Sequence, residues 1–373
     1  MNRSSKVPLY KQLKQKIKKD IQDSFYQIGQ IIPTEQDFCE EFAISRQTVR
    51  EAITELVNEG LVERVQGKGT IVKARGPVAR NRYMTGIIVP GLDLFISKIV
   101  VGVEKVLSKY NYKLLFANTD SDLELQKKYI KELKDEEVSG MIVFPAEDKN
   151  VDEQIKELEA EGFPLVIIDR ILENVDANYV TVNNTGGGYK AVDYLINLNH
   201  RHIGFVSHCF WKTSSVKDRF AGYKKALKEY QLPLEEKNIL SYNPYDINKK
   251  ATIDMISRYL TKNDRPTALF AVNDLIAIDL INICRRLAIR IPDDLSIIGF
   301  DNSELLTRLN IPLTTIAQPK EEIGVKAAQL LIEQVENNSP RERLVLPTKL
   351  IIRKSCDILN KKQPNKCKET YFS

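Results

Sequence analysis

A regular alternation that begins near Thr85 limits the possible folds of this chain more than any other feature. Short apolar runs, bounded by polar or turn residues, alternate there with amphipathic helical segments. Strict alternation of strands and helices predicts parallel sheets with helices on both faces. The expected strands are residues 87–89, 114–116, 141–144, 165–168, 203–206, 268–271 and 296–298.

About seven such strands over about 270 residues are too many for one comfortable sheet. We therefore expect an α/β domain of two lobes, with a ligand in the crevice at the carboxyl ends of the strands. A chain of 373 residues leaves room for a further, smaller folding unit before this domain.

The first eighty residues follow a different pattern. Apolar residues recur every four positions after Pro8 and predict one stripe on a first helix: Leu9, Leu13, Ile17, Ile21 and Phe25. Pro33-Thr34 followed by Asp37 predicts the capped start of a short second helix. After a turn at Ala43-Ile44, Ser45 is expected to cap a third helix.

The third helix has two distinct faces. The inner face is apolar and consists of Val49, Ala52, Ile53, Leu56 and Val57. The outer face of the first turns is polar and consists of Arg46, Gln47, Thr48 and Arg50. A recognition helix enters the major groove of DNA by its N-terminal end, where Arg can pair with guanine and Gln with adenine. The outer face therefore indicates DNA binding.

A basic hairpin is expected to complete this unit. Two short strands, 61–65 and 70–72, flank Gln66-Gly67-Lys68-Gly69, whose glycines permit positive φ and a close approach to DNA. Each element alone also fits a helical module with a solvated basic face, but their order favours an α+β winged helix-turn-helix domain. Residues 1–80 hold 14 Lys/Arg against 10 Asp/Glu, which suits a polyanionic partner and equally a solvated helix face.

Residues 7–73 resemble the GntR family of bacterial regulators. The resemblance rests on P-L-Y, I-P-T-E-Q-D-F, S-R-Q-T-V-R-E-A and L-V-N-E-G-L-V-E-R-V-Q-G-K-G-T. It implies base or phosphate contacts by Arg46, Thr48 and Arg50, and a wing contact by Gln66, Gly67 and Lys68. The implied DNA-binding set also includes Thr34, Glu35, Ser45, Gln47 and Gly69.

Polar residues collect where the strands of the larger domain end. They are Asp169-Arg170, Asn273-Asp274 and Asp301-Asn302, with Asn183-Asn184 and Arg219 near helix starts. These types suit a sugar-like effector, because each can bond two neighbouring hydroxyls while Trp211 or Phe95 covers the apolar face of the ring. Strand ends also attract Asp and Asn as helix caps, and Trp211 fits plain core or hinge packing equally well.

Residues 85–355 are similar to the LacI/GalR effector-binding domain and so to periplasmic sugar-binding proteins. The shared motifs are S-G-M-I-V-F-P, V-I-I-D-R, V-T-V-N-N-T-G-G-G-Y-K-A-V-D-Y-L, N-H-R-H-I-G-F-V, D-R-F-A-G-Y, A-V-N-D-L-I-A, I-P-D-D-L-S-I-I-G-F-D-N and L-T-T-I-A-Q-P. By position, Arg219, Asn273, Asp301 and Gln318 would hold effector hydroxyls, with Asp169, Trp211 and Phe95 near the pocket.

A GntR-type head on this domain resembles the AraR family of arabinose repressors in Gram-positive bacteria. That resemblance implies a homodimeric repressor that binds a palindromic operator and is released by a sugar, with L-arabinose the leading effector. Other sugars, sugar phosphates and nucleobases remain as alternatives, as does a sugar-binding protein without a regulatory role.

The predicted organisation is a winged helix-turn-helix domain at 1–74, a linker at 75–84, the two-lobed domain at 85–358 and a disordered tail at 359–373. Lobe 1 is expected to comprise 85–182 and 319–338, and lobe 2 to comprise 183–318 and 339–358. Gly76-Pro77 disfavours a helix through the linker, so the hinge helix of LacI/GalR proteins has no expected counterpart.

We expect no catalytic residue, metal or cofactor. His200, His202 and His208 lack a cysteine or carboxylate at ligand spacing, and no G-K-[ST] follows Gly186 to Gly188. Five scattered cysteines favour buried thiols over disulfides, and paired carboxylates lack a nucleophile motif, which disfavours an enzyme. No run approaches the ~18 apolar residues of a membrane span and no apolar stretch follows the basic start, so we expect a cytoplasmic protein away from the membrane.

Overall fold

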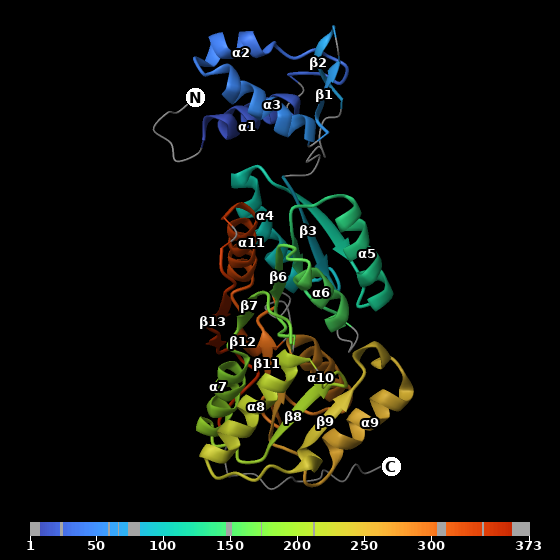
Figure 1. The fold of residues 1–373 in the computed structure, drawn as a ribbon. Coiled ribbons are helices and arrows are strands. Elements are labelled where there is room, and N and C mark those ends of the chain that lie inside the picture. Colours follow the sequence, from blue (N-terminus) through green and yellow to red (C-terminus); the bar gives the residue numbers. More distant parts are fainter. Residues whose placement is uncertain are drawn as a thin grey trace, which may run out of the picture. The chain divides into compact units, whose positions relative to one another are not determined.

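The computed structural model describes residues 8–22, 25–58, 60–65, 67–73, 83–146, 151–172, 174–211, 213–303, 311–337 and 339–359. The chain divides into two compact units, Met1–Arg82 and Tyr83–Ser373 (Figure 1). Gln66, the expected linker at 75–82 and the expected tail from 360 onward lie outside the described residues. The last expected linker residue, Met84, already begins a strand.

The N-terminal unit packs three helices and a hairpin around one core. Its elements are α1 (Leu9–Gln22), α2 (Glu35–Phe42), α3 (Arg46–Asn58), β1 (Val62–Val65) and β2 (Gly69–Val72). The strands pair antiparallel, with Val62 opposite Val72. The apolar stripe of α1 packs against the inner face of α3, in a cluster that includes Leu13, Ile17, Ile21, Phe38, Val49, Ile53 and Leu56. This core holds α3 and the hairpin in one rigid head.

Phe25 does not belong to the stripe that its spacing predicted. Helix α1 ends at Gln22, and the Phe25 side chain is 71% exposed, whereas the neighbouring Tyr26 is buried. Because the helix has already ended, a spacing of four no longer places Phe25 on the inner face.

The first lobe of the larger unit is a parallel sheet of six strands in the order β13-β7-β6-β5-β3-β4. The strands are β3 (Met84–Val89), β4 (Lys113–Asn118), β5 (Met141–Val143), β6 (Leu165–Ile168), β7 (Asn178–Val182) and β13 (Arg343–Leu346). Ile87 and Val89 face α4 (Leu94–Leu107) and α11 (Lys320–Asn337). Ile88 faces the opposite side, with α5 (Leu123–Asp135) and α6 (Val151–Ala160). Each strand is apolar at successive positions because its side chains pack against helices on both faces of the sheet.

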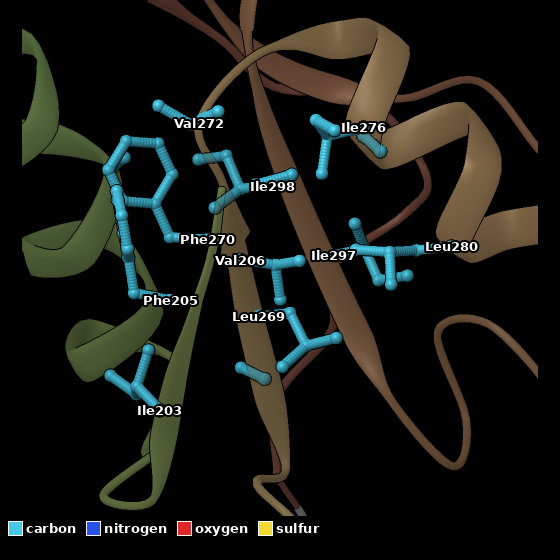
Figure 2. Close-up of a cluster of buried hydrophobic side chains, with 14 of the residues drawn as sticks. Ile203, Phe205, Val206, Leu269, Phe270, Val272, Ile276, Leu280, Ile297 and Ile298 are labelled. Carbon is cyan, nitrogen blue, oxygen red and sulfur yellow. The ribbon is translucent and has the colours of Figure 1, made fainter. Parts of the chain in front are cut away.

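The second lobe repeats this plan with the order β14-β12-β11-β10-β8-β9. Its strands are β8 (Ile203–His208), β9 (Ile239–Tyr242), β10 (Ala268–Ala271), β11 (Ser296–Asp301), β12 (Thr314–Ala317) and β14 (Lys349–Ile351). Its helices are α7 (Asn184–Asn197), α8 (Ser214–Glu229), α9 (Lys250–Thr261) and α10 (Asp274–Arg286). Figure 2 shows the buried side chains of β8, β10 and β11 with Ile276 and Leu280 of α10. Only the β12–β14 pair of these strands is antiparallel.

The chain passes between the lobes after β7, after β12 and between β13 and β14. The prediction that residues 339–358 belong to the second lobe is wrong for β13, because Arg343–Leu346 pairs in parallel with Tyr179–Val182 of the first lobe. The crossing falls only after Leu346. A short edge strand such as R-L-V-L carries no local signal for the sheet that it joins.

Candidate functional site

Capping hydrogen bonds fix the start of α2 and the start of α3. The Thr34 hydroxyl accepts from the Asp37 N–H at 3.2 Å, and the Asp37 carboxylate accepts from the Thr34 N–H at 2.8 Å. The Thr34 hydroxyl also donates to the Asp37 carboxylate at 2.8 Å, and this bond, together with the one from the Thr34 N–H, lowers the pKa of Asp37. Ala43 ends α2 with φ of 51°, and the Ser45 hydroxyl accepts from the Thr48 N–H at 3.2 Å. Helix α3 therefore begins at a defined angle to α2, as in a helix-turn-helix.

Exposed polar side chains cover the start of α3. Arg46, Gln47 and Arg50 are exposed, and Thr48 is half-buried. Arg50 Nη2 lies 3.1 Å from a Glu35 carboxylate oxygen, and Arg46 Nη2 lies 3.1 Å from Gln36 Oε1. The predicted side chains of α2 and α3 thus form one surface, which suits contact with a duplex.

The tip of the hairpin is exposed and built for tight backbone curvature. Gly67 and Gly69 have φ of 77° and 108°, which favour glycine, and Lys68 lies between them. The Lys68 N–H donates to the Val65 carbonyl at 3.0 Å and closes the turn. The tip therefore presents a lysine on a narrow backbone, which suits contact with a DNA groove.

In the larger unit, Arg219 lies at the centre of a polar cluster. Its side chain is buried, with Nε donating to Asn184 Oδ1 at 2.9 Å and Nη1 to the Val272 carbonyl at 2.8 Å. The guanidinium carbon is 3.8 Å from the centre of the Phe300 ring. Nη1 also lies 3.5 Å from an Asp301 carboxylate oxygen. Four neighbouring groups therefore fix the position of the Arg219 guanidinium without a ligand.

The glycines at the start of α7 make room for this arginine. A Cβ on Gly187 would lie 2.6 Å from the Phe300 ring, and a Cβ on Gly188 would lie 2.3 Å from the Arg219 carbonyl oxygen. The first turn of α7 therefore packs directly against Arg219 and the ring beneath its guanidinium. The Asn183 side chain caps α7 by accepting from the Gly186 N–H at 2.6 Å.

Asp301 ends β11 in a backbone conformation that is rare for residues with a side chain. Its φ is 109° and that of Asn302 is 54°. Gln318 Nε2 donates to Asp301 at 2.7 Å, and the buried Gln318 Oε1 has no hydrogen-bond partner among the described residues. Burial raises the pKa of Asp301, although Arg219 and Gln318 oppose the shift. The Asp301 carboxyl group and the Gln318 amide can therefore both hydrogen-bond to a polar ligand.

Asn273 and Asp274 lie at the start of α10 and form different hydrogen bonds. The Asn273 side chain accepts from the Ile276 N–H at 2.9 Å and so caps α10, which is the alternative that the sequence left open beside effector binding. Asp274 is buried and accepts from the Thr315 hydroxyl at 2.6 Å and the Ser303 N–H at 2.7 Å. Burial and the nearby Asp301 raise the pKa of Asp274. Asp274 therefore supports the loop that carries Asp301.

The first lobe contributes Asp169 and Arg170 from the end of β6. Asp169 is buried with φ of 66°; burial raises its pKa, and Arg219 and Arg170 lower it. The Arg170 guanidinium lies 4.9 Å from the Phe144 ring centre, and Nη1 donates to the Pro145 carbonyl. His208 ends β8 of the second lobe, and its pKa is lowered to about 4 by burial and by Arg219 and Arg170. Both lobes thus contribute charges to one cluster.

The two predicted aromatic residues lie in different surroundings. Phe95 is half-buried, 6.5 Å from Phe144 between ring centres, with Lys320 Nζ 5.6 Å from its own centre. Lys320 Nζ also donates to the Asn302 carbonyl at 2.8 Å. The Trp211 ring instead contacts Phe205 at 5.8 Å and Phe220 at 5.2 Å, in the second lobe's core. Phe95 therefore borders the polar cluster, while Trp211 packs on core aromatics.

The structure adds to the polar cluster three residues that sequence reasoning had not placed there, namely His208, Phe300 and Lys320. Arg170 and Asp274, which the sequence indicated only as polar residues at strand ends, also belong to this cluster. His208 ends a strand and Lys320 lies two residues after Gln318, which was the available signal. Phe300 precedes Asp301, but an aromatic residue within a buried strand is typical of plain core.

His200 and His202 hydrogen-bond to nearby residues of the second lobe. His200 bonds Thr267 and Ser296, and His202 bonds Asn238, so each has a local structural partner. Within the described ranges no group of three or more His, Cys, Asp and Glu side chains could hold a metal ion. Of the described cysteines, Cys284 and Cys356 are buried as expected, whereas Cys209 is exposed and Cys39 intermediate. Across the same part of the chain, no helix combines the length and apolar character needed to span a membrane.

Comparison with known proteins gives two family matches. Residues 9–72 match the model for bacterial regulatory proteins of the gntR family, and residues 192–356 match the model for a periplasmic binding protein-like domain. The two matches fall on the head and on the larger unit.

Similar proteins extend over nearly the whole chain. The "Arabinose metabolism transcriptional repressor" of Geobacillus stearothermophilus is 33% identical over 360 residues, covering 94% of this chain and 98% of that protein. The "HTH-type transcriptional repressor PurR" of Vibrio parahaemolyticus is 30% identical over 339 residues, covering 88% and 99%. A LacI family transcriptional regulator from Enterococcus faecium with bound ribose has a TM-score of 0.64 at 27% identity, covering 74% of this chain and all of that one.

Proposed function

This chain belongs to the bacterial transcriptional repressors that join a gntR-type DNA-binding domain to a periplasmic binding protein-like domain, and we propose that a small neutral sugar releases it from its operator. L-Arabinose is the leading candidate, because a relative that aligns along nearly the whole chain is named for arabinose metabolism. A repressor of this kind would act in the cytoplasm, where the operator lies.

The charge balance of the polar cluster carries the proposal of a neutral ligand. Arg170, Arg219 and Lys320 face Asp169, Asp274 and Asp301, three cations against three carboxyl groups. A phosphate would need an excess of cations and would meet the carboxylates of Asp169 and Asp301. Hydroxyl groups can donate to the carboxylates and accept from the guanidinium groups at the same time.

The DNA-binding role is proposed to rest on the surface of α2 and α3 together with the hairpin tip. Arg46, Thr48 and Arg50 would contact bases or phosphates, and Gln66, Gly67, Lys68 and Gly69 would form the wing contact. Two heads of a homodimer would then occupy the two halves of a palindromic operator. Sugar binding across the lobes would close them and change how the paired heads present themselves to DNA.

A titration of the full chain with neutral sugars tests the effector. L-Arabinose, D-xylose, D-ribose and D-galactose are compared with ribose 5-phosphate and free nucleobases, by thermal stability and by release of bound duplex. We expect one neutral sugar to stabilise the protein saturably and to release DNA. A response to the phosphate or to a nucleobase alone would contradict the neutral-sugar proposal and leave the repressor family standing.

The Asp301→Asn variant serves as the matched control. It keeps the size of the side chain but removes the charge that faces Arg219 and Gln318. We expect it to bind DNA as the wild type does and to lose most of the sugar response. An unchanged sugar response in this variant would remove Asp301 from the effector site.

A further inference from the structure

Arg64 occupies the corner between the hairpin and α3. Val62, two residues earlier on β1, is buried in the head core, so alternation places Arg64 on the same face of the strand, where it extends beyond the core. Arg64 Nη2 lies 3.4 Å from a Glu35 carboxylate oxygen and 3.4 Å from the Thr54 hydroxyl. A strand residue thus reaches across the exposed side of α3 to the start of α2.

Arg64 and Arg50 converge on the same carboxylate. Arg50 Nη2 contacts one Glu35 oxygen at 3.1 Å, and Arg64 Nη2 contacts the other. The side chains of Arg50 and Arg64 are 64% and 46% exposed, so both guanidinium groups remain open to solvent. Glu35 therefore holds two cations side by side on the surface that carries the predicted recognition residues.

We propose that Arg64 is a further DNA-contacting residue, which binds a backbone phosphate of the duplex beside the recognition helix. Its contacts with Glu35 and Thr54 in the free head are long, at 3.4 Å each, and the Arg64 side chain is 46% exposed, so the guanidinium can exchange these partners for a phosphate with little loss. A phosphate offers the paired oxygens that an arginine fork binds best. Such a contact would fix the hairpin against the backbone while Arg50 reaches the bases. This inference rests on the DNA-binding role of the head.

The salt dependence of DNA binding distinguishes a phosphate contact by Arg64 from a purely intramolecular ion pair with Glu35. The full chain is titrated against a duplex that the wild type selects from a random-sequence pool, at several KCl concentrations. Each phosphate contact adds about 0.9 to the slope of log affinity against log salt. We expect Arg64→Gln to reduce the slope by about 1 and to weaken binding about fivefold at 0.15 M salt. Arg64→Lys should restore most of the slope, because it restores the cation.

Lys73→Gln is the matched control, since Lys73 is also exposed, also adjoins the hairpin and pairs with Glu63 at 3.4 Å. It should leave slope and affinity unchanged. A wild-type slope in Arg64→Gln, or weaker binding with an unchanged slope and a less stable head, would overturn the proposal and make Arg64 a structural tie. If the wild type itself retained no duplex, the DNA-binding role would fail first.

Discussion

Buried charges at the polar cluster are stabilised by one another rather than by solvent. Arg219 pairs with Asp301 and lies over the Phe300 ring, while burial raises the pKa values of Asp169, Asp274 and Asp301. Charges in such a site cost free energy unless each finds a partner. A ligand with several hydroxyls can supply the missing partners, for example to the buried Gln318 oxygen.

His208 gives this cluster a pH dependence whose sign can be stated. Its pKa falls from 6.5 to about 4 in the folded protein, because burial and two arginines disfavour the imidazolium. Below pH 6.5 the imidazole is protonated in the unfolded chain but stays neutral in the folded chain. The stability that the neutral His208 contributes is therefore lost as the pH falls from 6.5 towards 4. At pH 5 the loss should be about 2 kcal/mol relative to neutral pH.

Denaturant unfolding of the wild type and His208→Gln at pH 7.5 and pH 5 isolates this effect. The variant cannot titrate at that position, while the carboxyl groups that also titrate are common to both proteins. The wild type should therefore lose about 2 kcal/mol more than the variant over this range. Equal losses would mean that His208 is protonated in the folded protein.

At the scale of elements, each lobe contains one pair of helices in backbone contact. A Cβ on Gly102 of α4 would lie 2.1 Å from the Glu321 carbonyl oxygen of α11, and one on Gly324 would lie 2.0 Å from that of Ile99. In the second lobe, a Cβ on Gly222 of α8 would lie 2.2 Å from the Thr185 carbonyl oxygen of α7. Helix axes can approach this closely only where side chains are absent.

Gly188→Ala should disturb the α7–α8 contact and the arginine that it positions. The added methyl group would meet the Arg219 carbonyl, and backbone on both sides limits relaxation. We expect a loss of about 1–3 kcal/mol in the free energy of unfolding, with weaker sugar binding. Gly91→Ala is the control, because nothing lies within 4 Å of its Cβ position. Chemical denaturation of both variants is the measurement, and a wild-type midpoint for Gly188→Ala would contradict the packing argument.

At the scale of the whole molecule, the chain is two units with different tasks. The head carries the exposed side chains that are predicted to contact DNA, and the larger unit carries the buried polar cluster. In the larger unit three chain crossings join the lobes, so each lobe can move as a body on short connections.

Sugar should stabilise the larger unit and leave the head's own unfolding unchanged. The ligand contacts only the larger unit, and a ligand at a hundred times its Kd adds about 2.7 kcal/mol to the unit that binds it. Differential scanning calorimetry should then show one transition that shifts with sugar and one that does not, and Asp301→Asn should abolish the shift. An equal shift of both transitions would mean that sugar alters the fold of the head.

Local patterns in the sequence determined much of this protein. The spacing of apolar residues predicted the helices of the head, and the seven expected strands appear as β3, β4, β5, β6, β8, β10 and β11. The cap at Thr34 and the glycines of the hairpin tip were readable because capping and positive φ depend on neighbouring residues. The DNA-facing side chains and the polar residues at strand ends were named for the same reason, and their roles remain predictions.

Only the tertiary structure decided which distant segments meet. It placed β13 in the first lobe and made the β12–β14 pair antiparallel, since edge strands pair through backbone groups that every sequence offers. It also ended α1 before Phe25, put Phe300 beneath Arg219 and brought Arg64 to Glu35. These contacts join residues far apart in the chain, and their free energy depends on how whole elements pack rather than on any local pattern.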